Sequence, residues 1–411
     1  MGPQSDVQCI DTKHVDVLDG VRAAAILVIV WYHLWQQSWL MPIFETPALS
    51  GLGISYINLD NIPRTGYLFV DLLLLLSAFC LFLPYARAAL LDEPYPSTRA
   101  FYKKRFVRIV PCYYLSALLI FFCYSLPAGV YWSAGSAWTD LFATLTFTQT
   151  FQMQTYLGTN INVVLWTAAV EMQFYLIFPL LAKAFTRRPL LTYLAMVGVS
   201  ELYLRGFALQ NEETLRMTLN QMVAFLGVFA NGMGGAYLFV LLSKRVQRSG
   251  WLSAICSAAF LAGLVPLAAV MNGAARAPVT QAYQAAVRLP LSLLFLALIF
   301  ALALSCRALR AVFSNRLARF IALISYNLYI WHQWIAVRLK EWRIPYWEGD
   351  TPPNMTGDLA WQWQYFLLSI GLAFGVAILV TYCFERPLSR RLPGRPARPL
   401  RSVNLTDTEE A

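Results

Sequence analysis

The sequence predicts an all-α, polytopic membrane protein with about ten transmembrane helices and both termini in the cytoplasm. Hydrophobic residues make up 58% of the 411 residues and charged residues 13%, with a mean hydropathy of +0.52, whereas soluble domains carry about 25% charged residues. Basic residues are also distributed unequally along the chain. Apolar windows of about 20 residues occur near 20–40, 66–86, 108–126, 162–184, 190–208, 219–242, 251–271, 288–306, 318–339 and 364–385.

The basic residues determine the expected orientation. With the N-terminus in the cytoplasm, the long 127–161 loop on the outside has no Lys or Arg. Only eight of the 32 Lys and Arg fall outside, namely Arg64, Arg205, Arg216, Arg276, Arg288, Arg338, Lys340 and Arg343. This asymmetry follows the positive-inside rule. The net charge of +10 is therefore interpreted as a topology signal and as contact with anionic membrane lipid, not as nucleic-acid binding.

The first segment carries Arg22 and His33, and ionisable residues inside a span are costly enough to suggest a function. Eleven positions at about 100° each return to the same helix face, with a rise of roughly 16 Å. Arg22 is expected near the cytoplasmic end and His33 in the outer half. Ala23, Ala24 and Ala25 precede the apolar stretch, which argues against a cleaved signal peptide.

Three further segments place ionisable groups at similar depth. Asp71, Glu171 and His332 are expected about 8, 14 and 9 Å below the outer surface. Since buried charge needs a partner or a cavity, some of them should converge with His33. A His/carboxylate pair suits general-base catalysis, with Glu171 supporting His33. The alternative is a hydrogen bond that joins two helices, and Asp71 can instead pair with a neighbour or cap a helix.

Before the third segment, Arg105 and Arg108 lie three residues apart and hence on one helix face. Neighbouring guanidinium groups suit bidentate phosphate binding, although basic residues at cytoplasmic helix ends are common. Together with Arg22 they match a phosphorylated nucleotide with an extended arm that reaches towards His33. Coenzyme A fits this description.

The rest of the chain indicates one membrane domain at 16–388, between a polar segment at 1–15 and an Arg/Pro-rich tail at 389–411 that is expected to be disordered. Aromatic residues of the outside loops 41–65, 127–161 and 340–363 are typical of an interfacial belt, with sugar stacking as the alternative. The seven cysteines lack a pairing pattern. The three histidines lack metal-ligand spacing, so no metal is expected.

Five elements resemble the acyltransferase-3 family of bacterial integral membrane acyltransferases over residues 14–391. The departures lie at Phe69 and Ala78, where the family commonly has glycine, and at Met172, where a second glutamate is frequent. The elements are Leu18-Asp19-Gly20-Val21-Arg22 through His33; Arg105-Phe106-Val107-Arg108 with Pro111 and Tyr113-Tyr114; Trp166 through Glu171 with Gln173-Phe174-Tyr175 and Pro179; Ser325-Tyr326 to His332; and Phe384-Glu385-Arg386-Pro387.

The resemblance implies a multi-pass enzyme of the inner (cytoplasmic) membrane that acylates hydroxyl groups. The donor would be cytoplasmic acyl-CoA, with acetyl-CoA expected, bound as substrate by Arg22, Arg105 and Arg108 with no permanently bound cofactor. The acceptor would be a glycan or similar molecule at the outer face. His33 would act as base or carry the acyl group. Asp71, Trp166, Tyr175 and His332 are candidates for acceptor binding or support.

Two other functions are compatible with the same residues. A proton-coupled transporter would use the buried His and carboxylates as a relay, although matching broken helices are not evident in the sequence. A non-catalytic receptor or scaffold would tolerate the loss of His33 and Glu171. The sequence indicates neither the acceptor, the acyl chain length, the oligomeric state nor the need for a partner protein.

Overall fold

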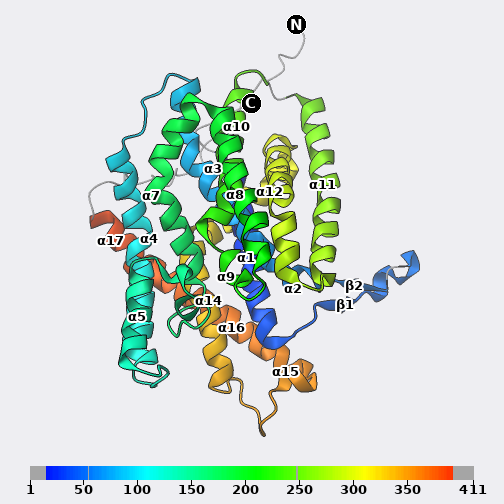
Figure 1. Cartoon of the computed structure of the whole chain (residues 1–411). Coiled ribbons are helices and arrows are strands. Elements are labelled where there is room, and N and C mark those ends of the chain that lie inside the picture. Colours follow the sequence, from blue (N-terminus) through cyan, green and yellow to red (C-terminus); the bar gives the residue numbers. More distant parts are fainter. Residues whose placement is uncertain (1–14, 54, 247–248, 392–411) are drawn as a thin grey trace.

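The computed structural model describes residues 15–53, 55–246 and 249–391, and these form a bundle of long helices (Figure 1). A helix of 18 residues or more occupies each of the ten predicted segments: α1 (Val17–Ser38), α3 (Phe69–Leu90), α4 (Thr98–Ile120), α7 (Leu165–Arg187), α8 (Pro189–Gly206), α10 (Leu226–Ser243), α11 (Gly250–Arg276), α12 (Thr280–Leu304), α14 (Arg316–Glu341) and α16 (Leu359–Leu379). The α4 and α16 helices continue as π-helical turns at Phe121–Ser125 and Val380–Glu385.

Eight helical segments of the described chain are long and apolar enough to cross a membrane. They contain all of the long helices except α8 and α14, which occupy predicted positions but are less hydrophobic. The charged residues of α14 lie in its first and last turns, as expected for a helix whose ends reach the polar membrane surfaces. The prediction of a polytopic all-α membrane protein is therefore confirmed.

Short elements fill the loops between the long helices. The only strand pair among the described residues is an antiparallel hairpin of β1 (Ile43–Glu45) and β2 (Tyr56–Asn58), in which Phe44 lies opposite Ile57. The remaining short elements are the helices α2 (Asn61–Arg64), α5 (Ala134–Leu145), α6 (Met153–Tyr156), α9 (Leu215–Thr218), α13 (Arg307–Phe313), α15 (Pro353–Thr356) and α17 (Arg386–Arg391), and the 3₁₀ turns Pro47–Leu52, Gly66–Leu68, Gln149–Phe151, Ala208–Gln210 and Met222–Phe225.

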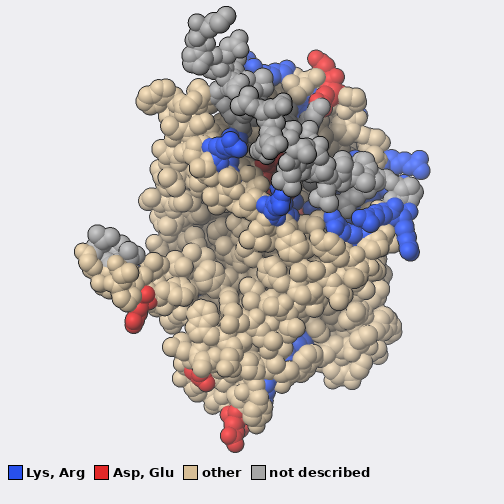
Figure 2. All heavy atoms as spheres, turned by 180° about the vertical axis from the view of Figure 1, so that it is seen from behind, with Lys and Arg blue, Asp and Glu red and all other residues tan. Residues whose placement is uncertain are grey.

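The chain ends lie largely outside the described residues. The predicted segment 1–15 is described only at Val15, and Cys9 falls in its undescribed part, while the other six cysteines are free thiols. Helix α17 extends to Arg391, three residues into the predicted 389–411 tail. Figure 2 shows Lys and Arg gathered towards one end of the molecule, which agrees with the predicted charge asymmetry.

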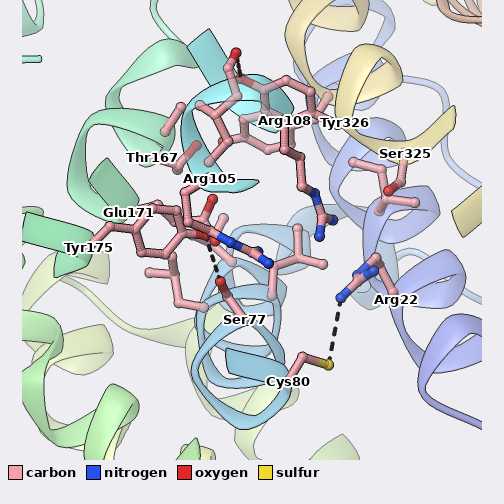
Figure 3. Close-up of a pocket in the computed structure, with 17 residues that line it drawn as sticks. Arg22, Ser77, Cys80, Arg105, Arg108, Thr167, Glu171, Tyr175, Ser325 and Tyr326 are labelled. Atoms are coloured by element: carbon pink, nitrogen blue, oxygen red, sulfur yellow. Dashed lines mark hydrogen bonds between the residues drawn. The ribbon is translucent and has the colours of Figure 1, made fainter. Parts of the chain in front are cut away.

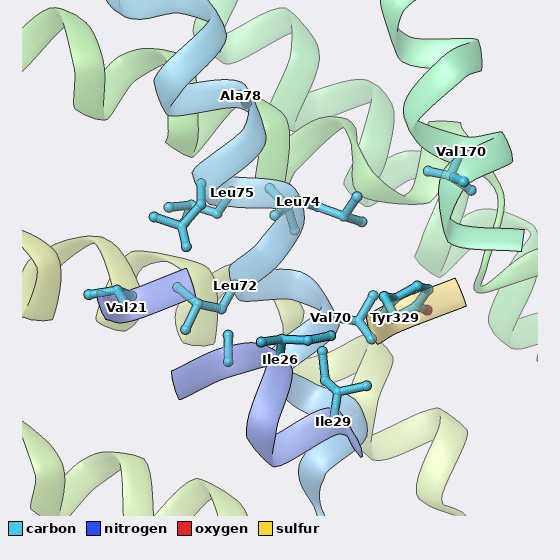
Figure 4. Packing of buried hydrophobic residues seen from close by; sticks show 14 of the residues in the cluster. Val21, Ile26, Ile29, Val70, Leu72, Leu74, Leu75, Ala78, Val170 and Tyr329 are labelled. Carbon is cyan, nitrogen blue, oxygen red and sulfur yellow. The ribbon is translucent and has the colours of Figure 1, made fainter. Parts of the chain in front are cut away.

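The core forms where α3 packs against α1, α7 and α10 (Figure 4). Helix α10 approaches α3 closely because it presents Gly232 to it. A Cβ atom at Gly232 would overlap the Leu75 carbonyl oxygen and lie 2.8 Å from the Ala78 Cβ. Ala78 is itself completely buried. The close approach is thus provided by a glycine on the partner helix, although α3 has alanine at 78.

A buried ion pair joins α3 to α12. The Arg288 Nε atom lies 3.5 Å from the Asp71 Oδ2, and the two side chains are 2% and 0% exposed. Arg288 also donates through Nη1 to the Leu219 carbonyl oxygen at 2.7 Å and lies over the Phe225 ring, 4.0 Å from its centre. The pair therefore connects two transmembrane helices to the short α9 segment. The sequence left two alternatives for Asp71, pairing with a neighbour or capping a helix, and the structure shows the pairing.

Helix α14 is tied to the π-helical end of α16. The Asn327 side chain donates from Nδ2 to Thr381 Oγ1 and to Glu385 Oε2, both at 2.8 Å. Tyr326 donates to the Ile109 carbonyl oxygen of α4 at 3.0 Å. These bonds hold the 325–332 stretch of α14 against two other helices.

We predict that Gly232→Ala lowers the stability of the bundle. The added methyl group overlaps backbone and Ala78, and such overpacking costs about 1–3 kcal/mol. Gly371→Ala in α16 is the control, since a Cβ there meets nothing within 4 Å and helix propensity gains up to about 1 kcal/mol. Thermal unfolding in detergent should show a lower Tm only for Gly232→Ala. Equal Tm values for the two variants would contradict the packing assigned to Gly232.

We also predict that the Asp71–Arg288 pair is coupled. Asp71→Ala leaves the Arg288 cation buried without its counter-charge, and breaking such a pair costs about 3–5 kcal/mol. Asp71→Ala/Arg288→Met removes both charges and should recover most of the Tm lost in the single variant. If the losses in Tm of the two single variants simply add, so that the double variant is less stable than either, the coupling of Asp71 and Arg288 is contradicted.

Candidate active site

A first cavity, with about 850 Å³ of empty space that includes open solvent, lies among α1, α3, α4, α7 and α14, and we call it the arginine cavity. It collects all three predicted phosphate-binding residues from two separate helices: Arg22 from α1, and Arg105 and Arg108 from α4. One carboxylate, Glu171 of α7, faces the same space. Three cations against one anion leave the lining with an excess of positive charge.

The guanidinium groups of the arginine cavity point towards one another across its opening (Figure 3). Arg22 Nη2 donates to Cys80 Sγ at 3.9 Å, and Arg105 lies over the Phe101 ring at 6.0 Å. The wall opposite Arg22 is closed by a hydrogen bond of 3.1 Å between Ser77 Oγ and the Tyr175 hydroxyl. Several donors thus converge on one space, as in a site that binds an anion bearing several oxygen atoms.

A second cavity, with about 950 Å³ of empty space, contains His33 and Trp166. We call it the amide cavity, because amide side chains are frequent in its wall. Its lining has one cation, Arg216, and no carboxylate. The full set of residues is Tyr32, His33, Gln36, Tyr67, Val70, Tyr156, Leu157, Trp166, Arg216, Leu219, Asn220, Thr280, Gln281, Gln284 and Tyr329.

The His33 imidazole is hydrogen-bonded to a second histidine. His33 Nδ1 and His332 Nε2 lie 2.9 Å apart, which joins α1 to α14. The other nitrogen of His332, Nδ1, lies 2.8 Å from the Tyr329 carbonyl oxygen and 3.1 Å from that of Leu328. His332 is 1% exposed and lines neither cavity, so it contacts the site through His33 and Tyr329.

These contacts assign the protons of the two rings. A carbonyl oxygen only accepts, so His332 Nδ1 carries a hydrogen, and in the neutral ring its Nε2 is an acceptor. His33 Nδ1 therefore donates to His332 Nε2, with the Ile29 carbonyl oxygen a further acceptor at 3.1 Å. The remaining lone pair of His33 is on Nε2. His33 thus has a basic nitrogen available in a ring whose orientation is determined by His332.

The two cavities share part of their walls. Val70 of α3 and Tyr329 of α14 line both, and both side chains are largely buried. Figure 4 shows these two side chains in the packed centre of the bundle. The cavity with the arginines and the cavity with His33 therefore adjoin at these two side chains.

The structure differs from the sequence-based hypothesis in the hydrogen-bond partner of His33. The expected partner of His33 was Glu171, but Glu171 lines the arginine cavity, and the side chain bonded to His33 is His332. Trp166 and Glu171 are five residues apart on α7, a rotation of about 140° and a rise of about 7.5 Å. One helix therefore presents Trp166 to the amide cavity and Glu171 to the arginine cavity.

The other predicted residues have clear positions. Tyr175 lies in the arginine cavity and Trp166 in the amide cavity, where its ring stacks on Phe225 at 6.1 Å between centres. Asp71 lines neither cavity and binds Arg288.

Several residues of the site were missed by the sequence analysis. Arg288 was counted as an outside charge, although an arginine within an apolar window is itself a signal of a buried partner. Arg216 belongs to the short helix α9, and the amides of the second cavity come from α1, from the turn after α9 and from the start of α12. No periodicity in the sequence indicates this spatial grouping. The missed lining residues with polar side chains include Ser77, Thr167, Ser325, Tyr326, Gln36, Asn220, Thr280, Gln281 and Gln284.

Comparison with known proteins assigns the chain to a family. No curated protein and no solved structure matches the sequence. The family model described as an acyltransferase domain (Acyl_transf_3) matches residues 15–385, which include both cavities and the histidine pair. The chain therefore belongs to the Acyl_transf_3 family of membrane acyltransferases.

Proposed function

We propose that this protein is an O-acyltransferase of the inner membrane that moves an acyl group, acetyl being the expected one, from cytoplasmic acyl-CoA to a hydroxyl of an acceptor at the outer face. One observation carries the proposal: the cavity with three arginines and the cavity with the histidine base share the Val70 and Tyr329 wall. A donor and an acceptor bound in these cavities would meet at this wall.

The arginine cavity supports binding of the donor. Coenzyme A carries a diphosphate and a 3′-phosphate, and guanidinium groups bind phosphates in bidentate geometry. Arg22, Arg105 and Arg108 would hold these phosphates at the cytoplasmic end. The pantetheine arm would then extend along the apolar part of the lining, which includes Leu73 and Leu74, towards Val70.

The acceptor hydroxyl would bind beside His33 in the amide cavity. His33 Nε2 removes the hydroxyl proton while the oxygen attacks the thioester carbonyl carbon. The new C–O bond forms, the C–S bond breaks, and the thiolate of coenzyme A takes the proton from the imidazolium. His332 is a positioning residue, since it orients His33 and accepts the hydrogen bond from Nδ1. Glu171 would act within the donor cavity, close to the arginines.

Transport is the competing function, because buried histidines also serve as proton relays. The arrangement favours transfer chemistry over a relay, since His33 and Glu171 line different cavities. Flux measurements in proteoliposomes separate the two functions. Proton-coupled substrate movement that is indifferent to acyl-CoA would contradict the proposal.

We predict that His33→Ala abolishes acyl transfer, whereas substitutions at His332 have graded effects. His332→Gln retains an acceptor for His33 Nδ1, while His332→Leu does not. General-base catalysis contributes about 10²–10⁴-fold, so kcat should fall strongly in His332→Leu and recover partly in His332→Gln. KM for acetyl-CoA should remain near the wild-type value in both variants.

The assay is acetyl transfer from acetyl-CoA by protein purified in nanodiscs. Full activity in His33→Ala would exclude His33 as base or acyl carrier. Equal kcat values in His332→Leu and His332→Gln would mean that His332 only fills space.

We predict that Arg105→Ala weakens donor binding. Loss of a charge-assisted hydrogen bond costs about 1.5–3 kcal/mol, so KM for acetyl-CoA should rise about 10- to 100-fold with little change in kcat. Lys103→Ala is the matched control, because Lys103 is an exposed cation of the same helix that does not line the cavity. An equal rise of KM in both variants would mean that only general surface charge matters.

A further inference from the structure

The lining of the amide cavity has a net positive charge. Its one cation is Arg216, and no carboxylate lines it. Within the described chain no carboxylate oxygen lies within 4.0 Å of the Arg216 guanidinium. Arg288, which is close by in the fold and buried, has Asp71 as its counter-ion. Arg216 is exposed, and it is a cation of the cavity lining whose guanidinium has no carboxylate partner among the described residues.

The backbone around Arg216 is held in place. Arg288 Nη1 donates to the Leu219 carbonyl oxygen at 2.7 Å. The Tyr203 hydroxyl donates to the Thr218 carbonyl oxygen at 3.2 Å. Asn220 Nδ2 donates to the Tyr156 hydroxyl at 2.6 Å. The segment that carries Arg216 is thus bonded to α12, α8 and α6, and its position relative to the cavity is defined.

The surrounding groups are neutral donors. Burial raises the pKa of Tyr156 to about 12, and the positive charges of Arg288 and Arg216 oppose this rise. Tyr156 is therefore protonated at physiological pH, and it accepts a hydrogen bond from Asn220, which leaves its own O–H free to donate. The Tyr67 hydroxyl, also in the lining, is buried and has no hydrogen-bond partner in the described structure. Buried polar groups normally have one, so a bound ligand would satisfy it.

We propose that the acceptor is an acidic sugar, and that Arg216 selects it by pairing with its carboxylate. This inference rests on the proposed acyl transfer. A single cation among neutral amides and phenols matches one negative charge better than the two charges of a phosphate monoester. The amides Gln281 and Gln284 and the ring of Trp166 supply hydrogen bonds and an apolar face for a pyranose ring. His33 lines the same cavity and would deprotonate a hydroxyl of the bound sugar ring.

The test uses two acceptors that differ only in charge, p-nitrophenyl β-D-glucuronide and its C6 amide. Full-length protein in nanodiscs receives acetyl-CoA, and acetylated product is measured by mass spectrometry. The wild type should prefer the acid about 10- to 100-fold in kcat/KM, because a charge-assisted hydrogen bond is lost with the amide. Arg216→Gln should reduce this preference to less than twofold, and Arg216→Lys should retain part of it.

Arg205→Gln is the matched control. Arg205 is also an exposed cation, in the last turn of α8, but it pairs with Glu201 at 2.8 Å and does not line the cavity. It should keep the wild-type preference. Equal use of acid and amide by the wild type would overturn the inference and leave acyl transfer intact. Preference for glucose 6-phosphate over the glucuronide would also overturn it, because the selected group would then be a phosphate.

Binding of the glucuronide is measured separately, as a shift in Tm without acetyl-CoA. Binding that depends on Arg216 but is followed by no acetylation would support the acidic site while contradicting the proposed transfer reaction. If neither binding nor acetylation depends on Arg216, the inference is wrong, whether or not the amide is acetylated.

Discussion

A polar or charged side chain inside an apolar helix bundle is stable only if it meets a partner or a cavity, and much of this structure follows from that constraint. Asp71 and Arg288 satisfy it as an ion pair that joins α3 to α12. His33 and His332 satisfy it as a hydrogen-bonded pair of neutral rings that joins α1 to α14. The three arginines of the first cavity satisfy it differently, by facing a common space. The Asp71–Arg288 pair thus joins helices away from both cavities, whereas the three arginines and His33 line a cavity.

The geometry of α1 links the two sites. Arg22 and His33 lie on one face of this helix, but the Val70 and Tyr329 wall falls between the cavities that they line. The α7 helix repeats this division, with Glu171 on the arginine side and Trp166 on the histidine side. Two helices therefore each contribute residues to both cavities. In the proposed reaction, the shared wall would join the donor site to the base without requiring either group to move through the bundle.

Most of the fold and part of the site could be predicted. All ten segments are helices, and Arg22, Arg105 and Arg108 converge as expected, because charged residues at the same end of neighbouring helices have few other places to lie. The expected pairing of His33 with Glu171 is not what the structure has, since the two residues line different cavities and His33 bonds to His332. Depth along the membrane normal is one coordinate, and it does not specify which helices are neighbours or how each is rotated about its axis. The close contact at Ala78 depends likewise on Gly232 of α10, which no local pattern of α3 reveals.

The sequence by itself determined the class of protein, the positions of its helices and the residue types available for chemistry, because apolar length, basic asymmetry and helical spacing are local properties. Only the tertiary structure decided which of these residues meet. It brings His332 to His33, Arg288 to Asp71 and Arg216 to a cavity without carboxylates. The physical reason is that helix order, rotation and tilt result from packing across the whole bundle, and differences of a few ångströms in that packing separate a hydrogen-bond partner from a residue in another cavity.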